Sequence, residues 1–234
     1  MCYSGIVYAA RVDTLTLTFQ ASGSLWRDAL VMQDLQTESL WSQISGECIS
    51  GALKGTTLQL LPSFHTTFAE FRKQYPNGLV LEKPERGGPR AYARYFNDPD
   101  KLGIFGRANT FEQLPAKSLV YGLRLDDGAY AVSEQALESN TAVVLNNASP
   151  PVVVLSSGDA SSAHAFHLPA TLDTDHLDLT LEDGVLTTPN SDHQWDAFTG
   201  AGLNDASPDL KTAPLISAYW FAWASFFPDT RLQE

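Results

Sequence analysis

Cysteine is scarce in this chain of 234 residues, which contains only Cys2 and Cys48. A single pair has no spacing signature, so one disulfide and two free thiols both stay open. Long apolar runs are missing as well: the longest, residues 216–227, is interrupted by serines and stops at Pro228. It is shorter than the roughly 20 residues that a membrane-spanning helix needs. We therefore expect a soluble protein without a membrane span.

Basic residues are few, with 15 Lys and Arg against 27 Asp and Glu and a formal net charge of −12. This balance repels phosphate backbones and anionic membrane surfaces, so we expect no nucleic-acid partner. The sequence also lacks phosphate-cradling glycine motifs and a dinucleotide fingerprint, so we expect no nucleotide cofactor, whereas a metal ion stays open. No basic segment with a following apolar stretch comes after Met1, so we expect no export signal in this chain.

Short strand patterns dominate the sequence. They are rich in β-branched or aromatic residues and are bounded by Gly, Asp, Asn or Pro, and they cover residues 5–10, 14–19, 118–125, 141–145, 152–155, 163–167 and 176–181. The turns at 126–128 and 182–184 predict hairpins. Helical spacing occurs only over 66–75 and 133–138. The pattern predicts a mainly β protein of the α+β type with a few short helices.

One order of elements occurs twice. Each unit has a strand pattern, a tryptophan followed five residues later by glycine, and then an aromatic stretch. The first unit has residues 15–19, Trp41 with Gly46, and residues 64–71; the second has residues 177–181, Trp195 with Gly200, and residues 219–227. Because a single repeat must bury its apolar face against something, a sibling repeat is the readiest partner. We predict two β-rich barrel or sandwich-like units related by duplication.

The domain boundaries follow from the repeat. Residues 1–81 form the first repeat, 82–117 an ordered linker or excursion, and 118–234 the second repeat. Apolar periodicity disappears in the middle segment, but its aromatic residues favour a loop packed on the body.

Several motifs resemble one family. Residues 37–43 read TESLWSQ, residues 51–55 read GALKG, and residues 219–226 read YWFAWASF before Pro228-Asp229-Thr230. In these motifs the chain resembles the bacterial and archaeal domain of unknown function 3179, which has no assigned activity to carry over. Its members usually have a further strand-rich segment and a second cysteine ahead of residues 2–5. The resemblance thus implies an incomplete first repeat, and it leaves open an extracytoplasmic location for longer relatives.

A metal site would have to come from histidine and cysteine. The candidate ligands are Cys2, His65, His164 and His167. His164 and His167 are the tightest pair, but three residues apart on a strand their rings point to opposite faces. Solvated or core histidines explain the same residues more simply.

A hydrolase would use residues near the two tryptophan motifs. The candidates are Glu38, Cys48, His65 and His193, and the substrate would be an ester or a glycoside. Residues 46–50 come near a nucleophile elbow, but the closing glycine is displaced to Gly51, and a small buried thiol is the simpler role for Cys48.

Aromatic side chains suggest a binding surface instead. Trp41, Trp195, Trp220 and Trp223 are the candidate ligand-contacting residues, although such runs more often form core. Our first hypothesis is a module that binds a small molecule or a protein in a cleft between the repeats. The hydrolase, with or without a metal, is the second. An exposed sheet edge at the incomplete N-terminus would also permit a homodimer.

Overall fold

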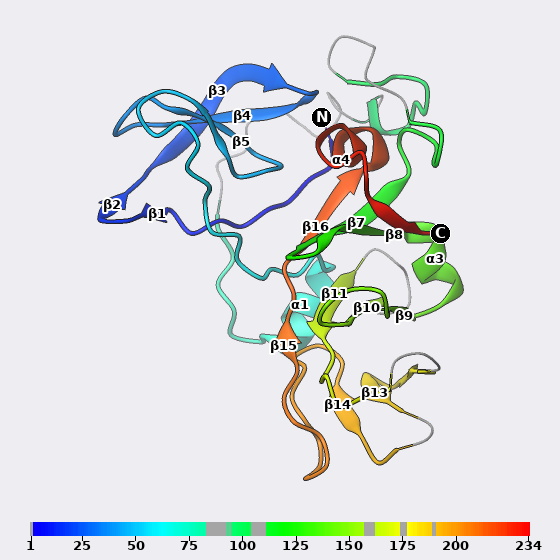
Figure 1. Ribbon diagram of the computed structural model, residues 1–234. Helices are drawn as coiled ribbons and strands as arrows, with labels where there is room; N and C mark the ends of the chain where they lie inside the picture. Colours follow the sequence, from blue (N-terminus) through cyan, green and yellow to red (C-terminus); the bar gives the residue numbers. More distant parts are fainter. Residues whose placement is uncertain are drawn as a thin grey trace.

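The computed structural model describes residues 2–82, 93, 95–103, 111–156, 162–173, 177–188 and 191–234. It confirms a mainly β fold of several small sheets with short helices (Figure 1). The sheets within these ranges stay open and form no closed barrel, so the barrel alternative was wrong. In the same ranges, no helix has the length and apolar content to cross a membrane. Parts of the predicted linker 82–117, and His176 of a predicted strand, lie outside the described residues.

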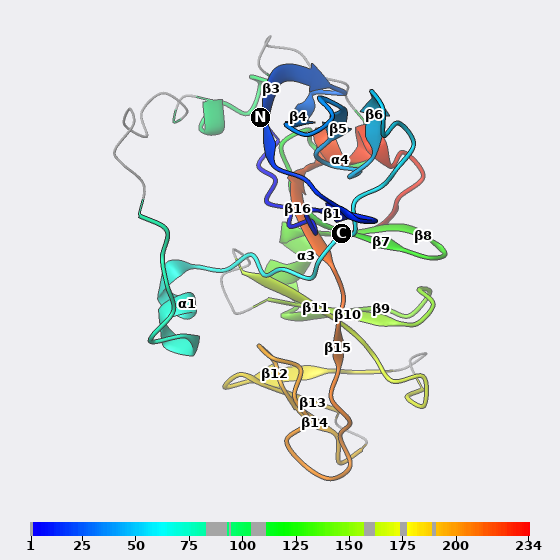
Figure 2. The same ribbon diagram turned by 90° about the vertical axis from the view of Figure 1, so that its left-hand side faces the viewer.

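The first half of the chain forms one twisted antiparallel sheet and a short helix. A small hairpin of β1 (Arg11–Val12) and β2 (Leu15–Thr16) comes first. The sheet follows in the order β3 (Phe19–Trp26), β4 (Ala29–Asp34), β5 (Leu40–Ser42) and β6 (Cys48–Ser50). Helix α1 (Phe68–Gln74) lies apart from this sheet, beside strands of the second half (Figure 2).

The second half forms three sheets. The upper sheet has the order β16 (Leu215–Tyr219), β7 (Leu119–Leu125), β8 (Gly128–Ser133) and β17 (Arg231–Gln233). The middle sheet has the order β15 (Lys211–Thr212), β11 (Ala163–His167), β10 (Val152–Ser156) and β9 (Ala142–Leu145). The lowest is β12 (Thr180–Glu182), β13 (Val185–Thr187) and β14 (Gln194–Asp196). Helix α3 (Glu134–Ser139) follows β8, and α4 (Trp220–Phe226) covers the upper sheet.

The two tryptophan segments have the same local structure. Trp41 in β5 pairs with Met32 of the preceding strand, and Trp195 in β14 pairs with Leu186. A turn follows each tryptophan and ends at a glycine with positive φ, +68° at Gly46 and +76° at Gly200. A Cβ atom on Gly46 would meet the ring of Tyr8, and one on Gly200 would meet the ring of Phe166. Only glycine therefore fits these two turns without strain.

The halves exchange backbone contacts. Gly5 of the first half forms an antiparallel bridge with Ser217 of the second, and Ala163 of the second forms one with His65 of the first. In each half, the segment after the tryptophan motif therefore pairs with the backbone of the other half. In this way α4 reaches the first sheet, where the Arg27 guanidinium donates to the Ser225 carbonyl at 2.8 Å.

The linker region is anchored where the structure describes it. Tyr95 is buried, and the ring of the adjacent Phe96 lies 5.7 Å from that of Tyr3 in the first half. The Lys117 ammonium donates to the backbone carbonyls of Tyr95 and Asp98, which are bonds within the same segment. This part of the predicted excursion thus packs on the body.

Candidate functional site

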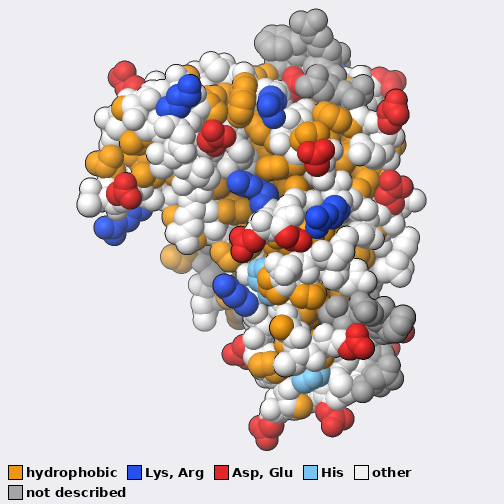
Figure 3. Space-filling model, in the orientation of Figure 1, with side chains coloured by type: hydrophobic (Ala, Val, Ile, Leu, Met, Phe, Trp, Pro, Cys, Tyr) orange, Lys and Arg blue, Asp and Glu red, His pale blue; other side chains and the backbone are white. Residues whose placement is uncertain are grey.

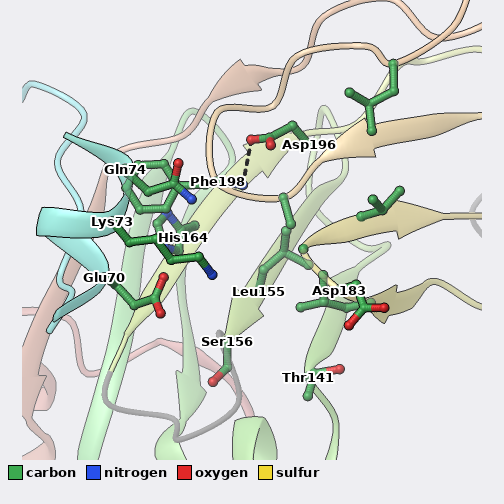
Figure 4. A pocket seen from close by; sticks show the side chains of 15 residues that line it. Glu70, Lys73, Gln74, Thr141, Leu155, Ser156, His164, Asp183, Asp196 and Phe198 are labelled. Carbon is green, nitrogen blue, oxygen red and sulfur yellow. Dashed lines mark hydrogen bonds between the residues drawn. The ribbon is translucent and has the colours of Figure 1, made fainter. Parts of the chain in front are cut away.

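A cavity of about 730 Å³ lies between α1 and the strands of the second half (Figure 4). The helix contributes Glu70, Lys73 and Gln74. The opposite wall comes from strands β10 to β14, from the residue before β9 and from the segment after β14. It consists of Thr141, Leu155, Ser156, His164, Leu181, Asp183, Gly184, Val185, Asp196, Ala197, Phe198 and Leu203. The cavity is therefore bounded by both halves of the chain.

Local sequence fixes the position of α1. The Thr67 hydroxyl caps the helix by accepting a hydrogen bond from the Glu70 amide at 3.2 Å. The Thr67 amide donates to Ser162 Oγ at 3.1 Å, and the adjacent Ala163 amide donates to the His65 carbonyl at 2.9 Å. These bonds join the start of the helix to β11. Glu70, Lys73 and Gln74 then share one helix face, because residues three and four apart are neighbours on a helix.

His164 is the most unusual group in the wall of the cavity. Only 3% of the residue is exposed, and its ring lies between Phe64 and Phe198, with centroid distances of 4.5 and 4.7 Å. Burial lowers the pKa of His164 to about 4, although Asp196 acts in the opposite direction, so the imidazole is neutral at pH 7. Its Nδ1 atom is buried and has no hydrogen-bond partner among the described residues, and the same is true of Nδ1 in His65, His167 and His193. The feature that separates His164 from these three histidines is its place in the cavity wall.

Acidic groups outnumber basic ones around the cavity. Glu70, Asp183 and Asp196 line it together with one cation, Lys73, and Glu70 and Lys73 project from α1 toward the opening (Figure 4). The Asp196 carboxylate accepts hydrogen bonds from the amides of Phe198 and Thr199 at 3.1 and 2.7 Å, which holds the turn that carries Phe198. Acidic side chains are also spread over the face in Figure 3, including its β12–β14 end. The surroundings therefore favour cationic or neutral molecules over anions.

The four tryptophans of the binding hypothesis lie in the interior. Trp41, Trp195, Trp220 and Trp223 are each 0% exposed, and none of them lines the cavity. Three of the indoles donate internal hydrogen bonds. Trp41 donates to the Asp34 carboxylate, Trp195 to the Pro208 carbonyl and Trp223 to the Thr230 hydroxyl, at 2.8, 2.8 and 2.9 Å. In this conformation their rings pack the core.

The four catalytic candidates lie on separate elements. Glu38 lies in the turn before β5, and Cys48 lies in β6, fully buried, where burial raises the pKa of its thiol. His193 stacks on Trp195 at 5.3 Å, beside β14 at the other end of the molecule (Figures 1 and 2). His65 pairs with Ala163, with its ring 6.1 Å from that of Tyr3. The structure does not bring these four side chains together.

The metal-ligand candidates are also separated. The described ranges contain no group of three or more His, Cys, Asp or Glu that could hold a metal ion. Cys2 and Cys48 are both free thiols, and Cys2 Sγ lies 3.0 Å from Ser4 Oγ. His164 and His167 occupy positions of opposite parity on β11, so only His164 lines the cavity.

Sequence reasoning missed most of the cavity wall. Of the residues in the wall it named only His164 as a site candidate, and it did so for a metal site. Glu70, Lys73 and Phe198 attracted no attention. The one available signal was the polar face of the helix predicted at 66–75, because Glu70 and Lys73 share it.

The fold and the cavity define a mainly β protein with a pocket between a helix of one half and the sheets of the other. The chain belongs to the family described as protein of unknown function DUF3179, whose family model matches residues 1–230. The resemblance inferred from the sequence motifs is thereby confirmed. The comparisons with curated proteins and with solved structures found no match.

Proposed function

We propose that this chain is a binding module that takes a small polar molecule into the cavity between α1 and the second half. The observation that carries the proposal is His164, a neutral and almost fully buried imidazole that lines the cavity and is held between Phe64 and Phe198. Apolar walls with a few converging polar groups are typical of ligand pockets. The volume of about 730 Å³ also lies in the range common for small-molecule sites.

The chemistry of the lining narrows the ligand. Phe198 and Leu155 offer apolar contacts, His164 offers one uncharged hydrogen-bonding group, and Glu70 and Asp183 offer carboxylates. An amine would interact favourably with the carboxylates, and a polyol would bond to them and to the imidazole. We therefore place primary amines and neutral polyols ahead of carboxylic acids and phosphates.

We also infer that residues 1–81 and 118–234 are two copies of one unit. The matching tryptophan turns and the exchanged bridges of His65 and Ser217 support this inference. The cavity then lies between the copies, since its helical wall comes from the first and its sheet wall from the second. An interface between the two copies is a site that neither copy has by itself, and such interfaces are common places for ligand pockets.

The hydrolase hypothesis receives less support from the geometry. Its proposed thiol, Cys48, is fully buried, and burial raises its pKa, which disfavours the thiolate that a nucleophile needs. The contacts of His65 and His193 are with aromatic rings and backbone rather than with Cys48 or Glu38.

A panel of compounds tests the binding module. The melting temperature of the full chain would be measured with small diamines, neutral sugars and polyols, and dicarboxylic acids, and each hit would be titrated by calorimetry. We expect hits among the amines or polyols. The variants His164→Gln and Glu70→Gln should weaken the binding of a hit roughly tenfold or more, because the first replaces the fixed imidazole by an amide of different geometry and the second removes a negative charge.

His167→Gln is the matched control, because His167 lies on the same strand but outside the cavity. It should bind the hit as the parent chain does. The proposal would be refuted if no amine or polyol bound, or if a hit bound equally well to all three variants.

A further inference from the structure

The cavity between α1 and the second half is charged at its mouth and mostly apolar at its floor. Lys73 and Asp183, at the mouth, are exposed to solvent. At the floor, Leu155, His164 and Phe198 are only 1%, 3% and 9% exposed. A ligand that fits both regions is therefore amphiphilic, with a polar head at the mouth and an apolar body inside.

The charged groups at the mouth form no ion pair with other described residues. In that part of the chain, the only ion pair joins Arg231 to Asp127, which do not line the cavity. Even Glu70 and Lys73, three residues apart on one helix face, do not pair with each other. The carboxylates and the ammonium group at the mouth can therefore bond to a ligand without breaking an ion pair inside the protein.

The sign of the charge at the mouth selects the head of the ligand. Glu70, Asp183 and Asp196 contribute carboxylates, and Lys73 contributes the one ammonium group in the lining. Negative charge is therefore in excess. Hydrogen bonds between an ammonium group and a carboxylate are about twice as strong as those between neutral groups. The mouth thus favours a primary ammonium head over a hydroxyl or a carboxylate.

The floor of the cavity is aromatic. The ring of Phe198 lies 4.7 Å from that of His164 and 5.2 Å from that of Phe64, so three rings form one cluster. An additional ring can pack against such a cluster edge-to-face or offset, which contributes more than its buried area alone. The floor thus favours a ligand with an aromatic body.

His164 provides a polar contact among these apolar side chains. A neutral imidazole has one donor nitrogen and one acceptor nitrogen, and a hydroxyl both donates and accepts. A hydroxyl on the ligand therefore pairs with either tautomer of His164. The opposite orientation, with the ammonium group inside, would bury a charge beside Leu155 and Phe198 at a large cost.

We infer that the cavity binds an aromatic primary amine that carries a hydroxyl on its ring. This inference rests on the proposed function, and it narrows amines and polyols in general to one arrangement of groups. The ammonium head lies at the mouth beside Glu70 and Asp183, the ring packs on Phe198, and the hydroxyl bonds to His164. A diamine would place its second charge on the apolar floor, and a polyol would leave the aromatic floor without an apolar partner.

Tyramine is the probe, because it has all three groups. Its affinity for the full chain would be measured by calorimetry beside that of analogues that each lack one group. Phenethylamine lacks the hydroxyl, 4-ethylphenol lacks the amine, and putrescine and sorbitol lack the ring. We expect tyramine to bind most tightly. Phenethylamine should bind roughly threefold to tenfold more weakly, and the other three compounds roughly tenfold or more.

Two variants assign the contacts. His164→Phe keeps an aromatic ring beside Phe64 and Phe198 but cannot bond to a hydroxyl, so tyramine and phenethylamine should bind to it equally well. Asp183→Asn should weaken tyramine roughly tenfold and leave 4-ethylphenol unchanged, because only tyramine is charged. Asp192→Asn is the matched control, since it removes the same charge from an exposed residue outside the cavity. It should leave the affinity for tyramine unchanged.

The outcomes separate this inference from the proposed function. If putrescine or sorbitol binds as tightly as tyramine, the inference is overturned while the proposed function stands. The inference is also overturned if phenethylamine binds the parent chain as tightly as tyramine does, if His164→Phe keeps the preference for tyramine, or if Asp183→Asn has no effect. If no amine or polyol binds at all, both are refuted.

Discussion

The pH dependence of folding provides the sharpest test of the environment assigned to His164. Burial lowers its pKa in the folded chain from 6.5 to about 4. The unfolded chain therefore takes up a proton on this residue at a higher pH than the folded chain does. It follows that protons favour unfolding between these two values.

The direction and size of the effect follow directly. The stability that depends on neutral His164 is fully present above pH 6.5, is lost as the pH falls toward 4, and changes no further below that. Because one pKa unit corresponds to about 1.4 kcal/mol, the whole loss is about 3 kcal/mol. That is a large share of the 5–15 kcal/mol by which typical domains are stable.

The assay is urea unfolding at several pH values between 7 and 4, for the parent chain and for His164→Gln and His164→Phe. The neighbouring carboxylates Glu70, Asp183 and Asp196 are present in all three proteins, so the comparison isolates the side chain at position 164. We expect the parent to lose about 3 kcal/mol more than either variant over this interval. The two replacements differ in polarity and size. If both variants show a weaker dependence of the free energy of unfolding on pH, the cause is the loss of the titrating imidazole rather than a change in packing.

Parallel stability curves for all three proteins would refute the reasoning. They would mean that the imidazole is protonated equally in the folded and unfolded chains. His164 would then be hydrated, and the cavity would lack the buried neutral group on which the proposed function depends.

Two packing predictions concern the upper sheet. Trp223→Ala should lower the free energy of unfolding by about 3–5 kcal/mol, because the indole is fully buried and donates to Thr230, whereas Phe71→Ala should cost less, since Phe71 is only partly buried. Gly122→Ala should cost about 1–3 kcal/mol, because its Cβ would overlap the Trp223 ring. Gly5→Ala is the control, with no atom within 4 Å of its Cβ. Chemical denaturation measures all four variants, and equal stability of the Gly122 and Gly5 variants would contradict the close contact between Gly122 of β7 and the Trp223 ring.

Local sequence patterns were sufficient to predict several helices and strands. The helix predicted at 66–75 is α1 (Phe68–Gln74), with Thr67 as its N-cap, and the one predicted at 133–138 is α3 (Glu134–Ser139), capped by Ser133. The strand predicted at 163–167 is β11. In each case the information lies within a few residues, in a capping hydroxyl or an alternating apolar pattern.

The cavity could not be derived in this way. Its walls meet because His65 pairs with Ala163, which is a contact between residues far apart in sequence. Nothing in the local pattern of residues 66–75 says that the helix lies against the second half rather than the first. Because each half contributes the segment after its tryptophan motif to the other half, the tryptophans themselves do not lie at the cavity, although the sequence suggested them as ligand contacts. Their indoles fill the interior of each half, while the open space lies where a helix crosses over.

The two helices that cross between the halves carry different side chains at matching places. Ile44 of the first half is fully buried in one apolar cluster with Phe221 and Ala222 of α4. Phe198 follows Trp195 by three residues, as Ile44 follows Trp41, and Glu70 is the third residue of α1, as Ala222 is of α4. Burying a carboxylate against a phenyl ring without a polar partner costs free energy, so Glu70 favours an open space beside α1, whereas Ala222 permits close apolar packing. If the two halves are copies of one unit, as we propose, the replacement of an alanine by a glutamate at this place explains why the cavity lies beside α1.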